Sequence, residues 1–351
     1  MKIGGAHVRG LYTYPAGSGT QFTDGADEIA ALGFPAFKFY CTQAYATDYP
    51  LETWSSAPTT CTQLLQTTEV AAQLARAEFT DYAITMFAFG NPNTNWWRDG
   101  GRADNPRLLV EYNEIYDAAV HLLTTYNNTG KTFVIQNWEG DWALVDGTPP
   151  GVPLDTQTGQ RNIDYCLAFH SARQRAVRDA MRVTAHYNVR VLYAVEVNRV
   201  LDVLDYPGRS RLLRDVLNRL EPDVVSYSAY DGTISVYGYG STQAEWEALT
   251  RTHFTRALRL IKQLCPKSLL QIGEYGFEEE RIAIDRPSYD AGEMAALVAQ
   301  IAEEEGASWL YYWEVFDNEA DGTTPTGVKG YWLTRPDGTT SLAAAALQAL
   351  L

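Results

Sequence analysis

Two glutamates at the ends of hydrophobic runs carry the strongest chemical signal in this chain. Glu139 follows the run TFVIQNW (132–138), and Glu274 follows the run SLLQIG (268–273). A carboxylate is costly to bury without partners, so a strand that delivers one at its end is expected to aim it into a cleft. Two carboxylates delivered from separate strands indicate paired-carboxylate chemistry, above all the cleavage of a glycosidic bond.

The segments that carry these glutamates belong to an alternation of strand-like and helix-like patterns. Apolar, β-branched or aromatic runs predict strands, and 3.6-residue periodicity predicts helices between them. The strands are expected at 7–14, 36–42, 82–90, 132–138, 189–197, 223–230, 268–276 and 307–316. The helices are expected at 24–33, 62–79, 106–126, 161–187, 209–220, 242–264, 289–306 and 341–351.

Alternation of this kind predicts an α/β fold with parallel strands and helices packed outside them. Eight strands and eight helices predict a single (β/α)8 TIM barrel as one catalytic domain over residues 1–351. No GxGxxG or GxxxxGK[ST] motif follows any of the expected strands, so the sequence does not favour a nucleotide-binding sheet.

The connections between these elements are of unequal length. The segments after strands are long and rich in Gly, Pro, Asn and aromatic residues, as at 45–60, 90–105, 140–159 and 231–241. The segments from helix back to strand are short, as at 127–131 and 221–223. In a barrel the long βα loops form the active face at the carboxyl ends of the strands, so both glutamates are predicted to lie on that face.

Residue parity along the expected strands groups further polar side chains with the two glutamates. Asn137 and Glu139 share a face with Phe133 and Ile135, and Glu274 shares one with Leu270 and Ile272. We expect Asn137, Glu139 and Glu274 to point across the top of the barrel. Glu196 and Asn198, which share a face of the fifth strand, are expected beside them as substrate contacts. For Glu196, a contact with a residue that itself binds the substrate and a structural ion pair are the alternatives.

The motifs NWEGDW (137–142) and IGEYGF (272–277) resemble those of clan A of the glycoside hydrolases. Members of this clan are (β/α)8 retaining enzymes whose acid/base Glu ends strand four and whose nucleophile Glu ends strand seven. The resemblance implies that Glu274 is the nucleophile and Glu139 the acid/base, with Asp141 as a rival acid. Many members have Asn directly before the acid/base Glu and use it to bind a substrate 2-hydroxyl. Here Trp138 separates Asn137 from Glu139, as in some mannanase-type members, which are also similar in the GDW tail.

Two further motifs resemble strands six and eight of the same clan. SYSAYD (226–231) is similar to the strand whose aromatic hydroxyl contacts the nucleophile, which implies Tyr227 or Tyr230. WLYYWEVF (309–316) is similar to the strand whose Trp forms the floor under the reacting sugar, which implies Trp313. Indole rings in the loops after strands suit sugar stacking, although packing at the rim alone would explain two of them. They are Trp96, Trp97, Trp138 and Trp142.

Three other charged residues on the expected strands have weaker interpretations. Arg9 and Lys38, on the first and second strands, would either orient the nucleophile or fill the barrel interior. Glu314 has the opposite parity to Trp313, so an outward ion pair is expected for it.

The composition excludes several classes of partner. With 28 Lys and Arg against 43 Asp and Glu, the net charge is −15, which disfavours binding to nucleic acid or to an anionic membrane surface.

No 18-residue apolar stretch predicts a membrane span, and no signal peptide begins the sequence, so a cytoplasmic protein and a trimmed secreted one both remain open. The five histidines form no HxH motif and the four cysteines no CxxC motif, so neither a metal nor another cofactor is predicted. Cys41 and Cys61 bracket one polar loop and are either a disulfide or two free thiols.

Together these patterns predict a retaining glycoside hydrolase that acts on an oligo- or polysaccharide without a cofactor. The alternative is a non-catalytic carbohydrate-binding TIM barrel that keeps the aromatic rim but lacks a working acid, and turnover of aryl glycosides would distinguish the two. The sugar, the linkage, endo or exo action and the oligomeric state are left open by the sequence.

Overall fold

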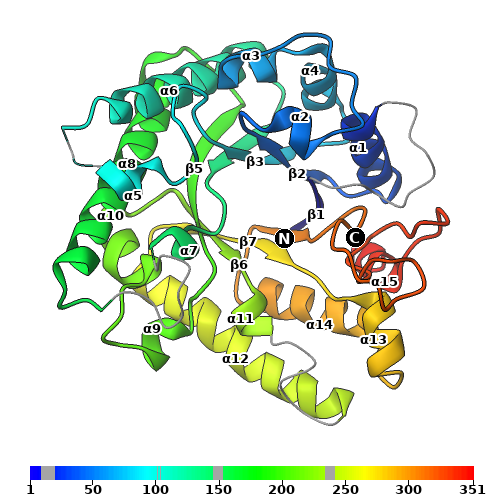
Figure 1. The fold of residues 1–351 in the computed structure, drawn as a ribbon. Coiled ribbons are helices and arrows are strands. Elements are labelled where there is room, and N and C mark those ends of the chain that lie inside the picture. The colour runs from blue at the N-terminus through cyan, green and yellow to red at the C-terminus, as the bar shows by residue number, and fades with distance from the viewer. Residues whose placement is uncertain (9–19, 101, 103, 145–152, 234–241) are drawn as a thin grey trace.

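Eight parallel strands close into a barrel in the computed structural model, which describes residues 1–8, 20–100, 102, 104–144, 153–233 and 242–351 (Figure 1). The strands pair in chain order, and β8 closes the barrel against β1. This confirms the predicted (β/α)8 fold. The strands are β1 (Lys2–His7), β2 (Ala36–Cys41), β3 (Asp81–Met86), β4 (Thr132–Gln136), β5 (Arg190–Val197), β6 (Val224–Ser228), β7 (Leu269–Tyr275) and β8 (Trp309–Tyr312).

Helices cover the outside of the barrel and follow the predicted alternation. The longer ones are α1 (Gln21–Ala31), α4 (Thr68–Ala75), α6 (Arg107–Thr125), α8 (Gln157–Val183), α12 (Gln243–Leu264), α14 (Ala291–Glu304) and α15 (Leu342–Gln348). The predicted helix 62–79 is two helices, because Thr67 accepts a hydrogen bond from the Val70 amide and caps α4 after α3 (Cys61–Leu65) has ended. The predicted helix 209–220 forms the π-helical turn η1 (Leu213–Leu217) followed by α10 (Asn218–Leu220).

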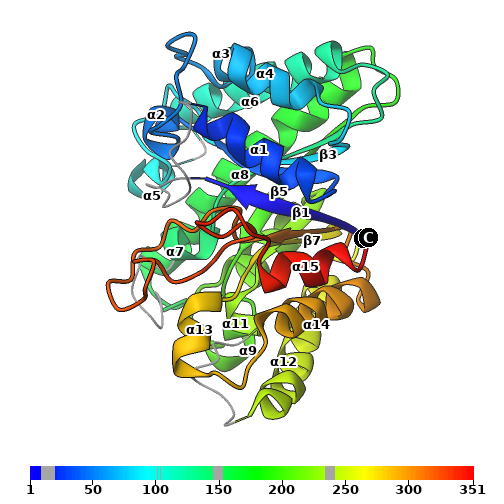
Figure 2. The ribbon, with the colours of Figure 1, turned by 90° about the vertical axis from the view of Figure 1, so that its right-hand side faces the viewer.

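Short helices interrupt the long segments that follow the strands. They are α2 (Tyr45–Asp48), α5 (Trp96–Gly100), α7 (Gly140–Leu144), α9 (Asp202–Asp205), α11 (Tyr230–Thr233) and α13 (Glu279–Asp285). In Figure 2 the arrow of β1 points to the left, and α2, α5 and α7 lie at that end of the barrel. The carboxyl ends of the strands therefore carry this extra structure, as expected for the active face of a barrel.

The first strand differs from its prediction. It runs from Lys2 to His7 rather than over 7–14, and residues 9–14 of the predicted strand lie outside the described residues. Two glycines lie at its centre. A Cβ on Gly4 would lie 2.4 Å from the Ala36 carbonyl oxygen, so glycine allows β1 to pack closely against β2.

The barrel interior is layered. A buried apolar cluster takes residues from six strands: Ala36, Ala83, Val134, Ala194, Val224, Trp309 and Tyr311. Above it Gln271 of β7 donates a hydrogen bond across the barrel to Gln136 of β4 at 2.7 Å. The side chains of Val134 and Gln136 therefore face the interior, whereas Phe133 and Ile135 belong to the outer core under the helices. The predicted sharing of an inner face by Phe133, Ile135 and Glu139 is corrected by this arrangement.

A buried arginine of α8 fixes the carboxyl ends of two strands. Arg173 donates to the carbonyl oxygens of Met86 on β3 and Gln136 on β4, at 2.7 and 3.2 Å. Its guanidinium also pairs with the buried carboxylate of Glu111 and donates to the Tyr193 hydroxyl. Arg173 thus holds the end of β4, directly before the segment that carries Glu139.

We expect Arg173→Met to lower the free energy of unfolding by about 3–5 kcal/mol, because the substitution leaves the buried Glu111 carboxylate without its cation. Denaturant unfolding followed by circular dichroism measures this loss. Arg178→Met is the matched control on the same helix, since the Arg178–Asp223 pair is exposed and should contribute about 0–1 kcal/mol. Equal losses for the two variants would contradict the role assigned to Arg173.

Candidate active site

The carboxyl groups of Glu139 and Glu274 share one hydroxyl partner at the mouth of the barrel. Ser228 Oγ lies 2.7 Å from Glu139 Oε1 and 3.4 Å from Glu274 Oε2. The distance between Glu139 Oε1 and Glu274 Oε2 therefore cannot exceed the sum of these two distances. That limit falls short of about 6.5 Å, where the carboxyl spacing of inverting glycosidases begins, and it includes the retaining spacing of about 5–5.5 Å.

An irregularity of the sheet turns Glu274 toward this hydroxyl. The register between β6 and β7 shifts between Tyr227 and Ser228, so that Tyr227 pairs with Ile272 while Ser228 pairs with Glu274. Leu270 and Ile272 lie in the outer core, but the Glu274 side chain contacts groups of the barrel interior. The shift, rather than simple alternation from Ile272, brings the carboxylate inward.

Glu139 lies three residues beyond the end of β4 and is held by contacts outside the strand. Its backbone has a φ of 30°, which is unusual for a residue other than glycine. The Glu139 amide donates to Glu196 Oε1 at 3.2 Å, and Trp142 Nε1 donates to Glu139 Oε2 at 2.8 Å. The side chain is partly buried, whereas that of Glu274 is buried.

A buried lysine pairs with the carboxylate at the end of β7. Lys38 Nζ of β2 lies 2.7 Å from Glu274 Oε1 and 3.1 Å from Glu196 Oε2. Of the two interpretations of Lys38, contact with the expected nucleophile is therefore the one seen. Arg9 lies outside the described residues.

The pair Glu139 and Glu274 is expected to retain a proton at a pH where isolated glutamates are ionised. Burial raises the pKa of Glu274, and the charges of Glu196 and Glu139 raise it further, while the Lys38 ammonium lowers it. Burial also raises the pKa of Glu139. The contact with Lys38 favours the ionised form of Glu274, but burial and the two neighbouring carboxylates outweigh it and raise the pKa of Glu274 to about 8.

The carboxylate of Asp141, the rival acid, is occupied by hydrogen bonds from the backbone. Its carboxylate accepts hydrogen bonds from the amides of Asn198, Arg199 and Leu212, at distances from 2.8 to 3.2 Å. The Asn198 side chain accepts from the Asp141 amide in return. Both residues are buried, and they join α7 to the end of β5 rather than approach Glu274. The geometry therefore favours Glu139 as the acid and gives Asn198 a structural contact.

The side chains of Asn137 and Glu196 also bond to neighbouring groups of the protein. The Asn137 side chain bonds to the backbone of Glu196 on both sides, accepting from its amide at 2.8 Å and donating to its carbonyl oxygen at 3.3 Å. Glu196 is 0% exposed and its carboxylate pairs with Lys38, which agrees with the ion-pair alternative. Asn137 is likewise buried and has the same kind of internal partner.

The four tryptophans of the loops divide into two pairs. Trp138 and Trp142 are 42% and 37% exposed, and Trp142 contacts Glu139. Trp96 and Trp97 are buried, with their rings against Phe169 of the outer helix α8. Trp96 and Trp97 therefore pack under helix α8, where neither indole face is open to a sugar.

The hydroxyl that touches both carboxyls comes from Ser228, which the sequence interpretation overlooked in favour of its aromatic neighbours. Ser226 and Ser228 point into the barrel, while Tyr227 between them stacks on Phe254 of α12 and donates to Asp231. Strand parity together with the polar type of both serines would have identified Ser228.

Tyr230 lies beside the site at the start of α11. Burial raises its pKa, and the charges of Glu274 and Glu139 raise it further, which reflects their proximity. Its ring meets that of Tyr331 edge to face, with centroids 6.4 Å apart. Of the two tyrosines implied by the resemblance, Tyr230 is therefore the one near the carboxyls.

Trp313 follows β8 next to the strand of Glu274. Its amide donates to the Tyr275 carbonyl oxygen at 2.8 Å, and its side chain is partly buried. The neighbouring Glu314 is fully buried, so the outward ion pair expected for it is wrong. Burial raises the pKa of Glu314, which favours its neutral form.

Metal and thiol chemistry find no support in the described part of the chain. There, no group of three or more His, Cys, Asp or Glu side chains is arranged to hold a metal ion. Cys41 and Cys61 are buried free thiols, which settles the alternative left open by their spacing. Nor is any helix over these residues long and apolar enough to cross a membrane.

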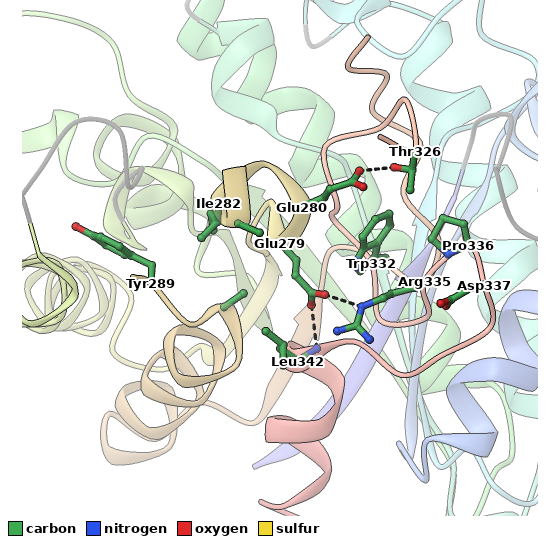
Figure 3. A pocket seen from close by; sticks show the side chains of 12 residues that line it. Glu279, Glu280, Ile282, Tyr289, Thr326, Trp332, Arg335, Pro336, Asp337 and Leu342 are labelled. Carbon is green, nitrogen blue, oxygen red and sulfur yellow. Dashed lines mark hydrogen bonds and ion pairs between the residues drawn. The ribbon is translucent and has the colours of Figure 1, made fainter. Parts of the chain in front are cut away.

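A separate cavity lies on the flank of the loops that follow β7 and β8. It has a volume of about 430 Å³ and is lined by residues of α13, of the segment 326–337 and of the start of α15 (Figure 3). Glu279 joins these segments, because its carboxylate accepts from Arg335 Nε at 2.7 Å and from the Leu342 amide at 2.9 Å. Neither Glu139 nor Glu274 lines this cavity.

Comparison with solved structures finds the same barrel in known glycoside hydrolases. A GH5_18 protein from Streptomyces cattleya in complex with Manβ1-4GlcNAc matches with a TM-score of 0.63 and 14% identity, over 99% of this chain and 79% of that one. The barrel resembles those of clan A glycoside hydrolases. No protein-family model and no curated protein sequence matches the chain.

Two other neighbours have the same degree of likeness. The exo-β-1,4-mannosidase Op5Man5 from Opitutaceae bacterium strain TAV5 has a TM-score of 0.59 and 15% identity, over 99% of this chain and 58% of that one. A Bacteroidetes-affiliated GH5 cellulase linked with a polysaccharide utilization locus has a TM-score of 0.56 and 15% identity, over 100% and 90%. At such low identity the likeness concerns the fold, and the chemistry must be argued from the site.

Proposed function

We propose that the protein is a retaining glycoside hydrolase in which Glu274 is the nucleophile and Glu139 the acid/base. The observation that carries this proposal is the single hydroxyl of Ser228 shared by both carboxyls, which keeps Glu139 Oε1 and Glu274 Oε2 closer than about 6.5 Å, where the inverting range begins. The Lys38 ammonium supports the ionised form that a nucleophile needs, since it opposes the rise that burial causes in the pKa of Glu274, and the raised pKa of Glu139 supports a protonated acid.

In the first step a Glu274 oxygen attacks the anomeric carbon while the bond from that carbon to the leaving oxygen breaks. Glu139 gives its proton to the leaving oxygen, and the sugar remains bound to Glu274 as an ester. In the second step Glu139, now ionised, takes a proton from a water molecule whose oxygen displaces Glu274. Two inversions at the anomeric carbon give net retention.

The substrate class we propose is a β-linked hexoside of the gluco or manno series, within an oligo- or polysaccharide. Its support is the set of structural neighbours, which includes a complex with Manβ1-4GlcNAc, an exo-β-1,4-mannosidase and a cellulase. Four aromatic side chains are proposed to contact the sugar, since they are at least partly exposed and lie in the segments that follow the strands: Trp138, Trp142, Trp313 and Tyr230.

A screen of aryl β-glucosides, aryl β-mannosides and the corresponding polysaccharides tests the proposal. Proton NMR of the first product should show the β-anomer before mutarotation. A first product with the α-configuration would contradict the retaining mechanism. Binding of oligosaccharides without turnover of any substrate would instead favour the non-catalytic carbohydrate-binding barrel.

The pH dependence of kcat/KM should be bell-shaped. Activity is lost at low pH when Glu274 becomes protonated, and at high pH when Glu139 loses its proton. Burial raises the pKa of Glu274 to about 8 and also raises the pKa of Glu139, so both limbs are expected above the ordinary range of a glutamate. With a dinitrophenyl glycoside, whose leaving group needs no proton, the basic limb of kcat/KM should flatten. A basic limb that is identical for both substrate types would contradict the role of Glu139.

A further inference from the structure

A third carboxylate, that of Glu196, connects the two proposed catalytic residues from inside the barrel. Its Oε1 accepts from the Glu139 amide at 3.2 Å, and its Oε2 accepts from Gln136 and Ser226, each at 2.8 Å, and from Lys38 at 3.1 Å. An ionised carboxylate accepts about four hydrogen bonds and donates none. The acceptor capacity of Glu196 is therefore filled.

The directions of the neighbouring hydrogen bonds suit a carboxylate at Glu196. Ser226 Oγ accepts from Gln271 Nε2 at 3.0 Å, so the Ser226 proton is directed at Glu196. Gln136 uses its oxygen to accept from Gln271, which leaves its amide protons for Glu196. A proton on Glu196 would meet only donors, and the shared proton of the site must reside on another carboxyl.

Lys38 donates all three of its ammonium protons to acceptors below the mouth of the barrel. They are donated to Glu196 Oε2, to the Gly273 carbonyl oxygen at 3.0 Å and to Glu274 Oε1 at 2.7 Å. Burial lowers the pKa of Lys38, but the carboxylates of Glu196 and Glu274 outweigh it and raise the pKa above its usual value. Lys38 thus stays charged and has no proton left for Glu139.

The chain makes room for the third carboxylate directly before the proposed nucleophile. A Cβ on Gly273 would lie 2.3 Å from Glu196 Oε2 and 2.1 Å from Ser226 Oγ. Any other residue at this position would displace Glu196 or Ser226. The glycine in the IGEYGF motif therefore serves the contact with Glu196.

We propose that Glu196 is a positioning residue for both Glu139 and Glu274, and that its negative charge keeps one proton on this pair of carboxyls. Glu196 Oε1 accepts from the Glu139 backbone amide. Glu196 Oε2 accepts from the Lys38 ammonium, which in turn pairs with Glu274. In the described part of the chain the charged groups that face it are Lys38 from β2, Glu139 after β4 and Glu274 from β7. This inference rests on the proposed function for its catalytic meaning, but its electrostatic content can be measured without substrate.

Carbon-13 NMR titration of glutamate carboxyl groups in the wild type and in Glu196→Gln tests the charge. Glu139→Gln and Glu274→Gln assign the two signals. Removing the negative charge of Glu196 should lower the apparent pKa of both Glu139 and Glu274, because that charge raises both in the wild type. Glu303→Gln, at an exposed carboxylate of α14, is the matched control and should leave both titrations unchanged. Unchanged titrations in a folded Glu196→Gln variant would overturn the proposal.

Glu196→Asp tests the positioning role and decides the matter if Glu196→Gln does not fold. This variant keeps the charge but shortens the side chain, so the bond to the Glu139 amide is lost. We expect kcat/KM to fall by about 10²-fold in a variant that remains folded, with both carboxyl titrations near those of the wild type. Activity within twofold of the wild type would overturn the positioning role. If the wild type turns over no glycoside, the proposed function fails, while the titrations still test the charge of Glu196.

Discussion

Glu274→Ala is expected to abolish turnover of every glycoside, with a loss in kcat on the order of 10⁵–10⁶-fold, the scale seen when an enzyme loses its covalent nucleophile. The reason is that no other carboxylate among the described residues combines contact with the shared Ser228 hydroxyl and an ion pair with Lys38. Steady-state rates with aryl glycosides and with a natural linkage measure the loss.

External azide provides a second readout for this variant. Azide should enter the space left by the carboxylate and attack the anomeric carbon directly, which gives a glycosyl azide of inverted configuration. Glu303→Ala, at an exposed position of α14, is the control for a general effect of losing a glutamate and should retain wild-type rates. Activity of Glu274→Ala within tenfold of the wild type would remove Glu274 from the mechanism.

Glu139→Ala is expected to separate substrates by their leaving groups. Hydrolysis of natural linkages should fall by about 10²–10⁴-fold, because departure of a sugar hydroxyl needs a proton in the transition state. The first step with dinitrophenyl glycosides should be spared, because dinitrophenolate leaves without a proton. Azide should then react with the glycosyl-enzyme on Glu274 and yield a glycosyl azide of retained configuration.

Asp141→Ala is the matched comparison for this prediction. Asp141 is two residues from Glu139 and accepts three backbone hydrogen bonds, so its loss should lower the thermal midpoint without any dependence on the leaving group. If Asp141→Ala instead shows the leaving-group dependence and Glu139→Ala slows both substrate types equally, the acid has been assigned to the wrong residue.

The stability of the site and its chemistry depend on the same buried polar groups. Arg173 holds the ends of β3 and β4, Asp141 joins α7 to β5, and Glu196 joins the segments of Glu139 and Lys38. Each of these residues is buried and has several partners. Substitutions at them should therefore be judged by thermal midpoint and by rate together, since a loss of rate alone would not separate positioning from unfolding.

The alternation of apolar patterns along the sequence determined the barrel and placed both glutamates at strand ends, because a strand buried on both faces needs a continuous apolar run and an outer helix needs an apolar stripe. The same reasoning placed the first strand at 7–14 rather than at Lys2–His7, where Gly4 packs closely against Ala36. It also selected Tyr227 over Ser228, because an aromatic motif is more conspicuous than a small polar residue that faces inward.

Which side chains meet was decided only by the tertiary structure. Alternation along β7 would direct Glu274 with Ile272 toward the helices, and the register shift against β6 turns it inward instead. The partners of Glu196 come from β2, β4 and β6, and the burial of Trp96 and Trp97 depends on a helix more than sixty residues later in the chain. Local sequence encodes the period of an element and its polarity, whereas contacts between distant segments, and the charges they share, arise only when the barrel closes and brings the eight strand ends to one mouth.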